Sequence, residues 1–210
     1  MFPPVCTAQV ATPVGPARVH LQRPHGRPQI GTLVLGHGAG AGVQARDLLA
    51  ATQAGLAAGL TVVRVEQPWL VAGRRIAVAP PRLDDAWLAV VAGLDEAGPL
   101  VVGGRSAGAR VACRTATALG AVAVLALAFP LRTARADRLA ELQGPTVPRL
   151  VVQGERDVFG VPDPQPGVQV HVVTGADHSF AVRRADGRTS AQVHDEIVQT
   201  VQAWLSQTLT

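Results

Sequence analysis

A serine between two glycines is the first residue whose setting could support chemistry. Ser106 lies at the centre of Gly104-x-Ser-x-Gly108, directly after the apolar run Leu100–Val102 and directly before a stretch of helical spacing. This context predicts a sharp strand-to-helix turn, in which small neighbours are needed because the serine is held in a strained conformation close to other backbone. Ser106 is therefore a candidate nucleophile, although ordinary Gly-rich connections between a strand and a helix have the same composition.

A serine hydroxyl is a weak nucleophile at neutral pH, so it requires a base and a group that orients the base. His178 follows the run Val168–Val173, and Asp157 follows the run Arg149–Val152. If these runs are parallel strands, their carboxyl ends meet Ser106 at one edge of a sheet. The chain order serine, aspartate, histidine agrees with this interpretation. A solvated loop histidine and a turn-forming aspartate are the alternative interpretation of the same two residues.

Small residues after another strand candidate predict a site for a developing oxyanion. The segment Gly36-His-Gly-Ala-Gly40 follows Thr32–Leu35, and it would let a backbone N–H approach a substrate oxygen to about 2.7–3.1 Å. We assign this role to the N–H groups of Ala39 and Ala107, the latter at a helix N-terminus whose dipole favours negative charge. His37 precedes the serine in the chain and is expected to brace its loop rather than act as the base.

Short apolar runs alternate with longer segments of helical period, which predicts an α/β fold with a mostly parallel sheet covered by helices on both faces. About seven strands are expected, at Ala17–Leu21, Thr32–Leu35, Thr61–Val65, Leu100–Val102, Val122–Ala128, Arg149–Val152 and Val168–Val173. Helices are expected at Ala45–Ala58, Leu83–Ala97 and 190–206, with a helix beginning near Ala107 and a short one near Asp137–Leu142. The last long helix is expected to start with a capping box formed by Thr189 and Gln192. The segment between Phe129 and Arg149 leaves no room for a lid domain.

Length and composition favour one globular domain over residues 1–210, because 48% of the residues are hydrophobic and 16% are charged. The net charge of +4 comes with 19 basic residues, all arginine, that form no run longer than two. Without clustering or interleaved aromatic residues, nucleic-acid binding is not expected. We expect no membrane partner and a monomer or homodimer acting on a small-molecule substrate.

Two cysteines, Cys6 and Cys113, do not make a disulfide framework. The start of the chain, Met1 to Val14, has no charged region followed by a long apolar run, and the longest apolar segment, Ala121–Phe129, is too short to span a bilayer. A cytoplasmic location is therefore expected. No zinc spacing and no phosphate-binding glycine motif occurs, so neither a metal nor a cofactor is expected.

The motifs together resemble a known family. Four blocks carry the resemblance: 35–40 (LGHGAG), 66–75 (EQPWLVAGRR) with Pro80-Pro81, 103–108 (GGRSAG), and 153–160 (QGERDVFG) with 175–180 (GADHSF). They are similar to small lidless α/β-hydrolases of the dienelactone-hydrolase-like kind, and within these to a bacterial branch related to testis-expressed and NSL chromatin-complex-subunit hydrolase-like proteins. The paired arginines and prolines are the most diagnostic of this branch. The chain departs from its pattern at Gln67 and Ala107, and from dienelactone hydrolase in having serine rather than cysteine as the nucleophile.

This resemblance implies the α/β-hydrolase fold and a serine hydrolase that acts on a small ester or thioester through an acyl-enzyme intermediate. Trp69, Arg74 and Phe180 are candidates for lining a shallow substrate site, and an arginine there would favour an acidic substrate. Alternatively, Arg74 and Arg75 are structural, tied to loop carbonyls or to carboxylates such as Glu66. Relatives in chromatin complexes also leave open a hydrolase-like binding or scaffold module in which the triad does little.

Overall fold

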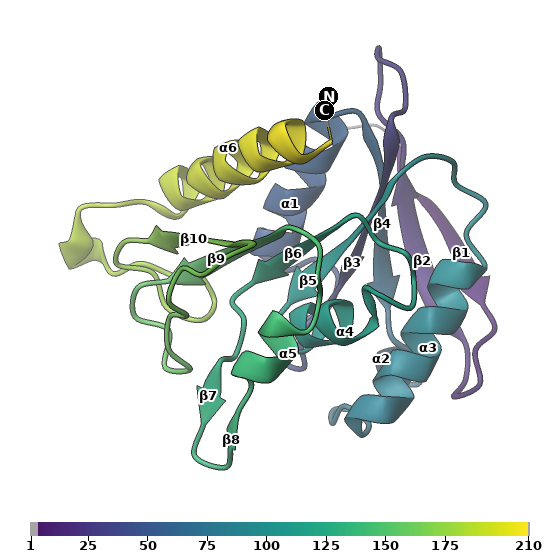
Figure 1. The fold of residues 1–210 in the computed structure, drawn as a ribbon, viewed down its shortest axis with the longest axis horizontal. Helices are drawn as coiled ribbons and strands as arrows, with labels where there is room; N and C mark the ends of the chain where they lie inside the picture. Colours follow the sequence, from purple (N-terminus) through teal and green to yellow (C-terminus); the bar gives the residue numbers. More distant parts are fainter. Residues whose placement is uncertain (1–3, 210) are drawn as a thin grey trace.

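The computed structural model describes residues 4–209, so residues 1–3 and 210 of the predicted domain lie outside the described part. Its centre is an eight-stranded sheet in the order β1-β2-β4-β3-β5-β6-β9-β10 (Figure 1). The strands are β1 (Cys6–Val10), β2 (Ala17–Gln22), β3 (Gly31–Gly36), β4 (Leu60–Glu66), β5 (Leu100–Arg105), β6 (Ala123–Leu127), β9 (Arg149–Gly154) and β10 (Val168–Val173). Strand β2 runs antiparallel to both β1 and β4, whereas β4, β3, β5, β6, β9 and β10 are parallel to one another.

Helices cover both faces of this sheet. The helices are α1 (Arg46–Ala57), α2 (Pro68–Val71), α3 (Pro80–Ala92), α4 (Ala107–Thr115), α5 (Leu139–Gln143) and α6 (Ser190–Thr208), with a short 3₁₀ helix, η1, at Arg184–Asp186. Figure 1 shows α1 and α6 together on one face, with α3 and α4 on the other. The mostly parallel α/β sheet with helices on both faces is therefore confirmed.

Successive side chains of the inner strands point to opposite faces of the sheet, and both faces are covered, so these strands appear in the sequence as continuous apolar runs. In β3, Leu33 and Leu35 pack in the cluster beneath α1 and α6, while Val34 between them packs with α3 and α4. Strands β6 and β9 divide their side chains between the two clusters in the same way. Inner strands of a parallel sheet are buried on both sides, so β3, β6 and β9 are mostly apolar without alternation, whereas the edge strand β10 alternates with Gln169 and His171.

The structure adds elements that periodicity did not predict. Strand β1 is an exposed edge strand without an apolar stripe, and it makes the sheet eight-stranded rather than about seven-stranded. Helix α2 is a single turn, and between β6 and α5 lies a small hairpin of β7 (Arg132–Thr133) and β8 (Ala136–Asp137). In the described chain, the segment between β6 and β9 contains only this hairpin and α5, which agrees with the expected absence of a lid.

Helix α3 spans Pro80–Ala92, so it begins and ends earlier than the predicted Leu83–Ala97. The two prolines occupy its first turn, where a missing N–H costs nothing, and Gly93 caps its end. The predicted capping box is confirmed at α6, where Thr189 and Gln192 exchange side-chain-to-backbone hydrogen bonds of 3.2 and 2.8 Å. Over residues 4–209 the structure contains no helix that is both long enough and apolar enough to cross a membrane.

Candidate functional site

Ser106 sits in the turn between β5 and α4 with φ 51° and ψ −111°, a conformation rare for a residue with a side chain. The flanking glycines make this turn feasible. A Cβ on either Gly104 or Gly108 would collide with the carbonyl oxygen of Gly36 in β3. The Ser106 N–H is bonded to the carbonyl of Leu127 at 2.9 Å, which ties the turn to β6. The backbone thus holds the serine outward at the start of a helix.

The structure brings the three sequence-predicted side chains together at the carboxyl edge of the sheet. The Nε2 atom of His178 lies 3.1 Å from Ser106 Oγ, and its Nδ1 atom lies 2.8 Å from Oδ2 of Asp157. Asp157 has a fully buried side chain, whereas the histidine side chain is 24% exposed. The imidazole can therefore donate from Nδ1 to the carboxylate and accept from the serine hydroxyl at Nε2.

Two further residues fix Asp157. Gln153, at 0% exposure, donates from Nε2 to Oδ2 of Asp157 at 2.8 Å and also contacts the carbonyls of Phe129 and Gly160. The N–H of Phe159 donates to Oδ1 at 2.9 Å. The Phe159 ring meets the imidazole of His178 edge-on, with 4.7 Å between ring centroids. Sequence reasoning did not find Gln153 or Phe159, although both lie in the block around Asp157 that carries the family resemblance.

The loops that carry the acid and the histidine are joined by backbone hydrogen bonds. The Arg156 N–H donates to the carbonyl of Ala176 at 2.8 Å, and the Gly175 N–H donates to Oε2 of Glu155 at 2.7 Å. Gly154 allows this approach, because a Cβ there would lie 2.5 Å from the carbonyl oxygen of Asp177. The relative position of Asp157 and His178 is thus set by one backbone–backbone hydrogen bond and one from a backbone N–H to a glutamate side chain.

Asp177 shapes the turn that carries the histidine. Its Oδ1 accepts hydrogen bonds from the Ser179 hydroxyl and from the N–H groups of Ser179 and Ala181. Burial acts against the charged carboxylate, but these hydrogen bonds outweigh it and hold the pKa of Asp177 below its ordinary value. An ionised Asp177 therefore keeps the His178 turn closed.

Arg105, the residue before the nucleophile, connects the turn to two other parts of the site. Its Nε donates to Oδ2 of Asp47 at 2.7 Å, and its Nη2 donates to the backbone carbonyl of His178 at 2.8 Å. Asp47 is in the first turn of α1 and is buried. Burial raises the pKa of the Asp47 carboxyl, while the Arg105 guanidinium opposes that shift. Sequence reasoning treated this arginine only as the variable residue of the glycine-serine motif.

The loop after β3 lies over this arginine and the serine. A Cβ added to Gly38 would be 3.2 Å from Nη1 of Arg105 and 3.3 Å from Cβ of Ser106. Ala39 follows in this loop and is exposed, while Ala107 is the first residue of α4, where N–H groups lack intrahelical acceptors. The assignment of both N–H groups to an oxyanion site stays a prediction.

His37 braces this loop from below. It is 3% exposed, its Nε2 accepts the N–H of Gln67 at 3.0 Å, and its Nδ1 faces the carbonyl of Gly38 at 2.8 Å. Both ring nitrogens are occupied, which fits the neutral ring with its proton on Nδ1. Burial lowers the pKa of His37, so the neutral form is favoured.

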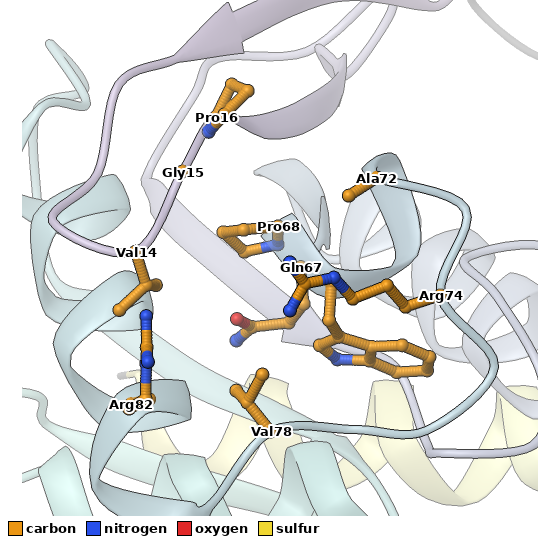
Figure 2. Close-up of a pocket in the computed structure, with 10 residues that line it drawn as sticks. Val14, Gly15, Pro16, Gln67, Pro68, Ala72, Arg74, Val78 and Arg82 are labelled. Atoms are coloured by element: carbon orange, nitrogen blue, oxygen red, sulfur yellow. The ribbon is translucent and has the colours of Figure 1, made fainter.

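The three predicted substrate-lining residues do not lie together. Phe180 is 5% exposed and packs in the core cluster that includes α1 and α6, so its packing does not support a lining role. Trp69 and Arg74 instead line a cavity of about 210 Å³ between the β1–β2 turn, α2 and α3 (Figure 2). Beside Ala107 there is only a hollow of about 10 Å³, which shares Trp69 and Gln67 with that cavity. Glu66 pairs with Arg18 and His20 rather than with the Arg74-Arg75 pair.

No group of three His, Cys, Asp or Glu side chains within residues 4–209 is arranged to hold a metal ion. The side chains that converge at the sheet edge are a hydroxyl, an imidazole and a carboxylate in hydrogen-bonded series, an arrangement chemically capable of acyl transfer.

A serine in a strained strand-to-helix turn, on an eight-stranded and mostly parallel sheet, defines the class of proteins with the α/β-hydrolase fold. The family model for the alpha/beta hydrolase domain matches residues 29–206, so the chain belongs to that family. No curated protein matches the sequence with significance.

Solved structures of the same fold cover nearly the whole chain. An alpha-beta serine hydrolase homologue from Coxiella burnetii superimposes with a TM-score of 0.73 at 19% identity, covering 100% of this chain and 99% of that one. An a/b serine hydrolase without a lid from Xanthomonas campestris gives 0.71 at 20% identity, covering 97% of each chain. Dienelactone hydrolase from Anabaena variabilis gives 0.72 at 14% identity, covering 99% of each chain. At these identities the similarity establishes the shared lidless fold.

Proposed function

We propose that this chain is a serine hydrolase that cleaves a small ester or thioester, with Ser106 as nucleophile, His178 as base and Asp157 as acid. The observation that carries the proposal is the hydrogen-bonded series from Oγ of Ser106 through the imidazole to the buried carboxylate, with steps of 3.1 and 2.8 Å. The family match and the names of the structural neighbours, which include serine hydrolases and esterases, support the same class of reaction.

The reaction begins when Ser106 Oγ attacks the substrate carbonyl carbon. The hydroxyl proton passes to Nε2 of His178, and the Asp157 carboxylate stabilises the imidazolium through Nδ1. The carbonyl π electrons move to oxygen, and the N–H groups of Ala39 and Ala107 are assigned to stabilise this oxyanion. Collapse expels the alcohol or thiol, which takes the proton from Nε2. Water then attacks the acyl-enzyme with the same histidine as base and releases the acid.

The setting of each group suits its role. The fully buried Asp157 has no access to bulk water and is instead satisfied by His178, Gln153 and the Phe159 N–H. The imidazole is partly exposed, so substrate and water can reach Nε2. The absence of an inserted domain in the described chain leaves the site shallow, which suits a small acyl group.

Labelling with a fluorophosphonate probe tests the proposal. The wild-type protein should be modified at Ser106 and should hydrolyse 4-nitrophenyl acetate, and Ser106→Ala should abolish both. Ser206→Ala is a matched control, because that serine is exposed on α6 and has no contact with the three side chains. A wild-type protein that neither labels nor turns over the ester would instead favour a binding or scaffold module.

A further inference from the structure

The cavity beneath the β1–β2 turn carries positive charge that no residue of the described chain neutralises. Arg74, after α2, and Arg82, in the first turns of α3, both line it. Figure 2 shows their side chains reaching toward the cavity from the two sides. Within residues 4–209, neither guanidinium makes a hydrogen bond or ion pair with another side chain. Both arginines are exposed, so water solvates their charges in the free protein, and an anion in the cavity would be attracted by both.

Acidic side chains near these arginines are bonded elsewhere or, like the exposed Asp85 three residues after Arg82 on α3, do not line the cavity. No aspartate or glutamate lines it. Asp84, on the same helix as Arg82, is bonded twice to Arg114 at 2.6 and 2.8 Å. Glu66, at the end of β4, is paired with Arg18 and His20. The cavity therefore presents two free guanidinium groups, whose flat donor arrays match carboxylate geometry.

A buried polar group at the same cavity also lacks a partner. Gln67 is 5% exposed, and its Nε2 donates to the carbonyl of Leu83 at 3.4 Å, which identifies its other amide atom as the oxygen. That Oε1 atom has no hydrogen-bond partner in the described chain. A buried acceptor without a donor is unfavourable, so this amide oxygen is satisfied when a guanidinium drawn toward a bound anion supplies an N–H.

The remaining lining and the volume define the chemical class of ligand. Val14, Pro16, Pro68 and Val78 provide apolar walls around the charged end. The cavity volume of about 210 Å³ has room for a short chain rather than for a large ring system. A carboxylate on a short aliphatic chain fits this space and this lining.

The cavity is placed to receive one end of a molecule that reacts at Ser106. Gln67 and Pro68 directly follow β4, and Ser106 directly follows β5, at the same carboxyl edge. Only β3 lies between these strands, so their ends are two strand spacings, or about 10 Å, apart. Trp69 and Gln67 line both the cavity and the small hollow next to Ala107, which makes them the partition between the two.

We propose that this cavity binds the carboxylate end of the acyl chain of the substrate, so that the preferred substrates are esters or thioesters of dicarboxylic acids. The proposal rests on the hydrolase function proposed above. Arg74 and Arg82 hold the distal carboxylate while the ester carbonyl lies at Ser106, and several methylene groups bridge the distance past Trp69.

Two isosteric esters test this assignment: the 4-nitrophenyl monoester of suberic acid and its analogue with a terminal carboxamide. The wild-type kcat/KM should be about tenfold or more higher for the acid than for the amide, mainly through KM. Arg74→Gln and Arg82→Gln should each remove most of this preference and leave the amide unchanged. Arg75→Gln is the matched control, because Arg75 is exposed but does not line the cavity.

The outcomes separate this inference from the proposed function. Hydrolysis of both esters at equal kcat/KM, or an equal loss in Arg75→Gln, would overturn the inference and leave the hydrolase intact. If neither ester is hydrolysed, the proposed function fails, and the substrate assignment fails with it. Isothermal titration calorimetry of suberic acid monoamide with the Ser106→Ala protein then tests directly whether the cavity binds a carboxylate. If it does, adding Arg74→Gln to that variant should weaken binding about tenfold.

Discussion

The Nη2 atom of Arg105 donates a 2.8 Å hydrogen bond to the backbone carbonyl of His178, two residues 73 positions apart in the chain. The same guanidinium is held by the buried carboxylate of Asp47 at 2.7 Å. The residue before the nucleophile therefore ties the histidine loop to the serine turn, and the first turn of α1 anchors it. This makes Arg105 a positioning residue for the proposed reaction.

We expect Arg105→Met to lower kcat for 4-nitrophenyl acetate by about tenfold or more, because a hydrogen bond from a charged donor is worth roughly 1.5–3 kcal/mol. KM should change much less, since the arginine does not touch the substrate. Arg105→Lys should recover only part of the rate, because an ammonium cannot span both partners. Arg110→Gln is the control: that arginine lies on α4 but bonds to Glu141. An equal loss of kcat in Arg110→Gln would show that the effect is not specific to the histidine loop.

Asp157→Asn should lower kcat by about 10⁴-fold, the scale observed when a serine triad loses its carboxylate. An asparagine amide at this buried position cannot stabilise an imidazolium and favours the wrong tautomer of His178. Single-turnover acylation with a 4-nitrophenyl ester measures the effect directly. Asp163→Asn, on the exposed loop after Phe159, should leave the rate unchanged. A rate of Asp157→Asn near that of wild type would contradict the assigned role.

Gly108→Ala should destabilise the fold by about 3 kcal/mol or more, since a Cβ at this position overlaps the carbonyl of Gly36 and overpacking against backbone has no easy relief. Gly144→Ala is the matched control, because the nearest atom to its Cβ would be 3.5 Å away at ordinary contact distance. Urea unfolding of the two variants measures the difference. Equal stabilities would show that the β3–α4 approach is less tight than described.

Stability should decrease when the pH falls below about 6.5, the ordinary pKa of histidine. The folded pKa of His37 is lowered by burial, so between that value and 6.5 the unfolded chain binds a proton that the folded chain does not. The contribution is present above 6.5 and is lost at up to about 1.4 kcal/mol per pH unit as the solution is acidified. Denaturant midpoints from pH 7.5 to 5 should show a flatter dependence for His37→Asn. The exposed His25→Asn should retain the wild-type slope.

The two thiols should differ in reactivity. Cys113 is buried, and burial raises its pKa to about 12, so almost no thiolate is present at pH 8. Cys6 is exposed on β1. Titration with Ellman's reagent at pH 8 should therefore show one fast-reacting thiol in the folded protein and two in 6 M guanidinium chloride. Two fast thiols in the folded protein would contradict the packing of α4.

Motif and strand context were sufficient to predict that Ser106, Asp157 and His178 lie together, because the carboxyl ends of parallel strands must share an edge. The apolar runs also predicted seven of the eight strands within a few residues of their observed ends. Strand β1 was missed because an exposed edge strand has no apolar stripe, and α2 because a single turn has no period. Phe180 was a reasonable aromatic candidate beside His178, but the left-handed backbone at that residue (φ 57°) accompanies a ring packed in the core.

The sequence by itself determined the fold class and the chain order of the three candidate catalytic residues. Both follow from local patterns: apolar runs, glycines near a serine, and loop positions after strands. Only the tertiary structure decided which other side chains hold Ser106, Asp157 and His178 in place. Gln153, Phe159 and the Arg105–Asp47 pair act through contacts between segments that are not periodic and not adjacent. The same holds for Arg74 and Arg82, which become one charged cavity only because α2 and α3 fold back beneath the β1–β2 turn. Such contacts depend on three-dimensional distance, which linear spacing does not encode.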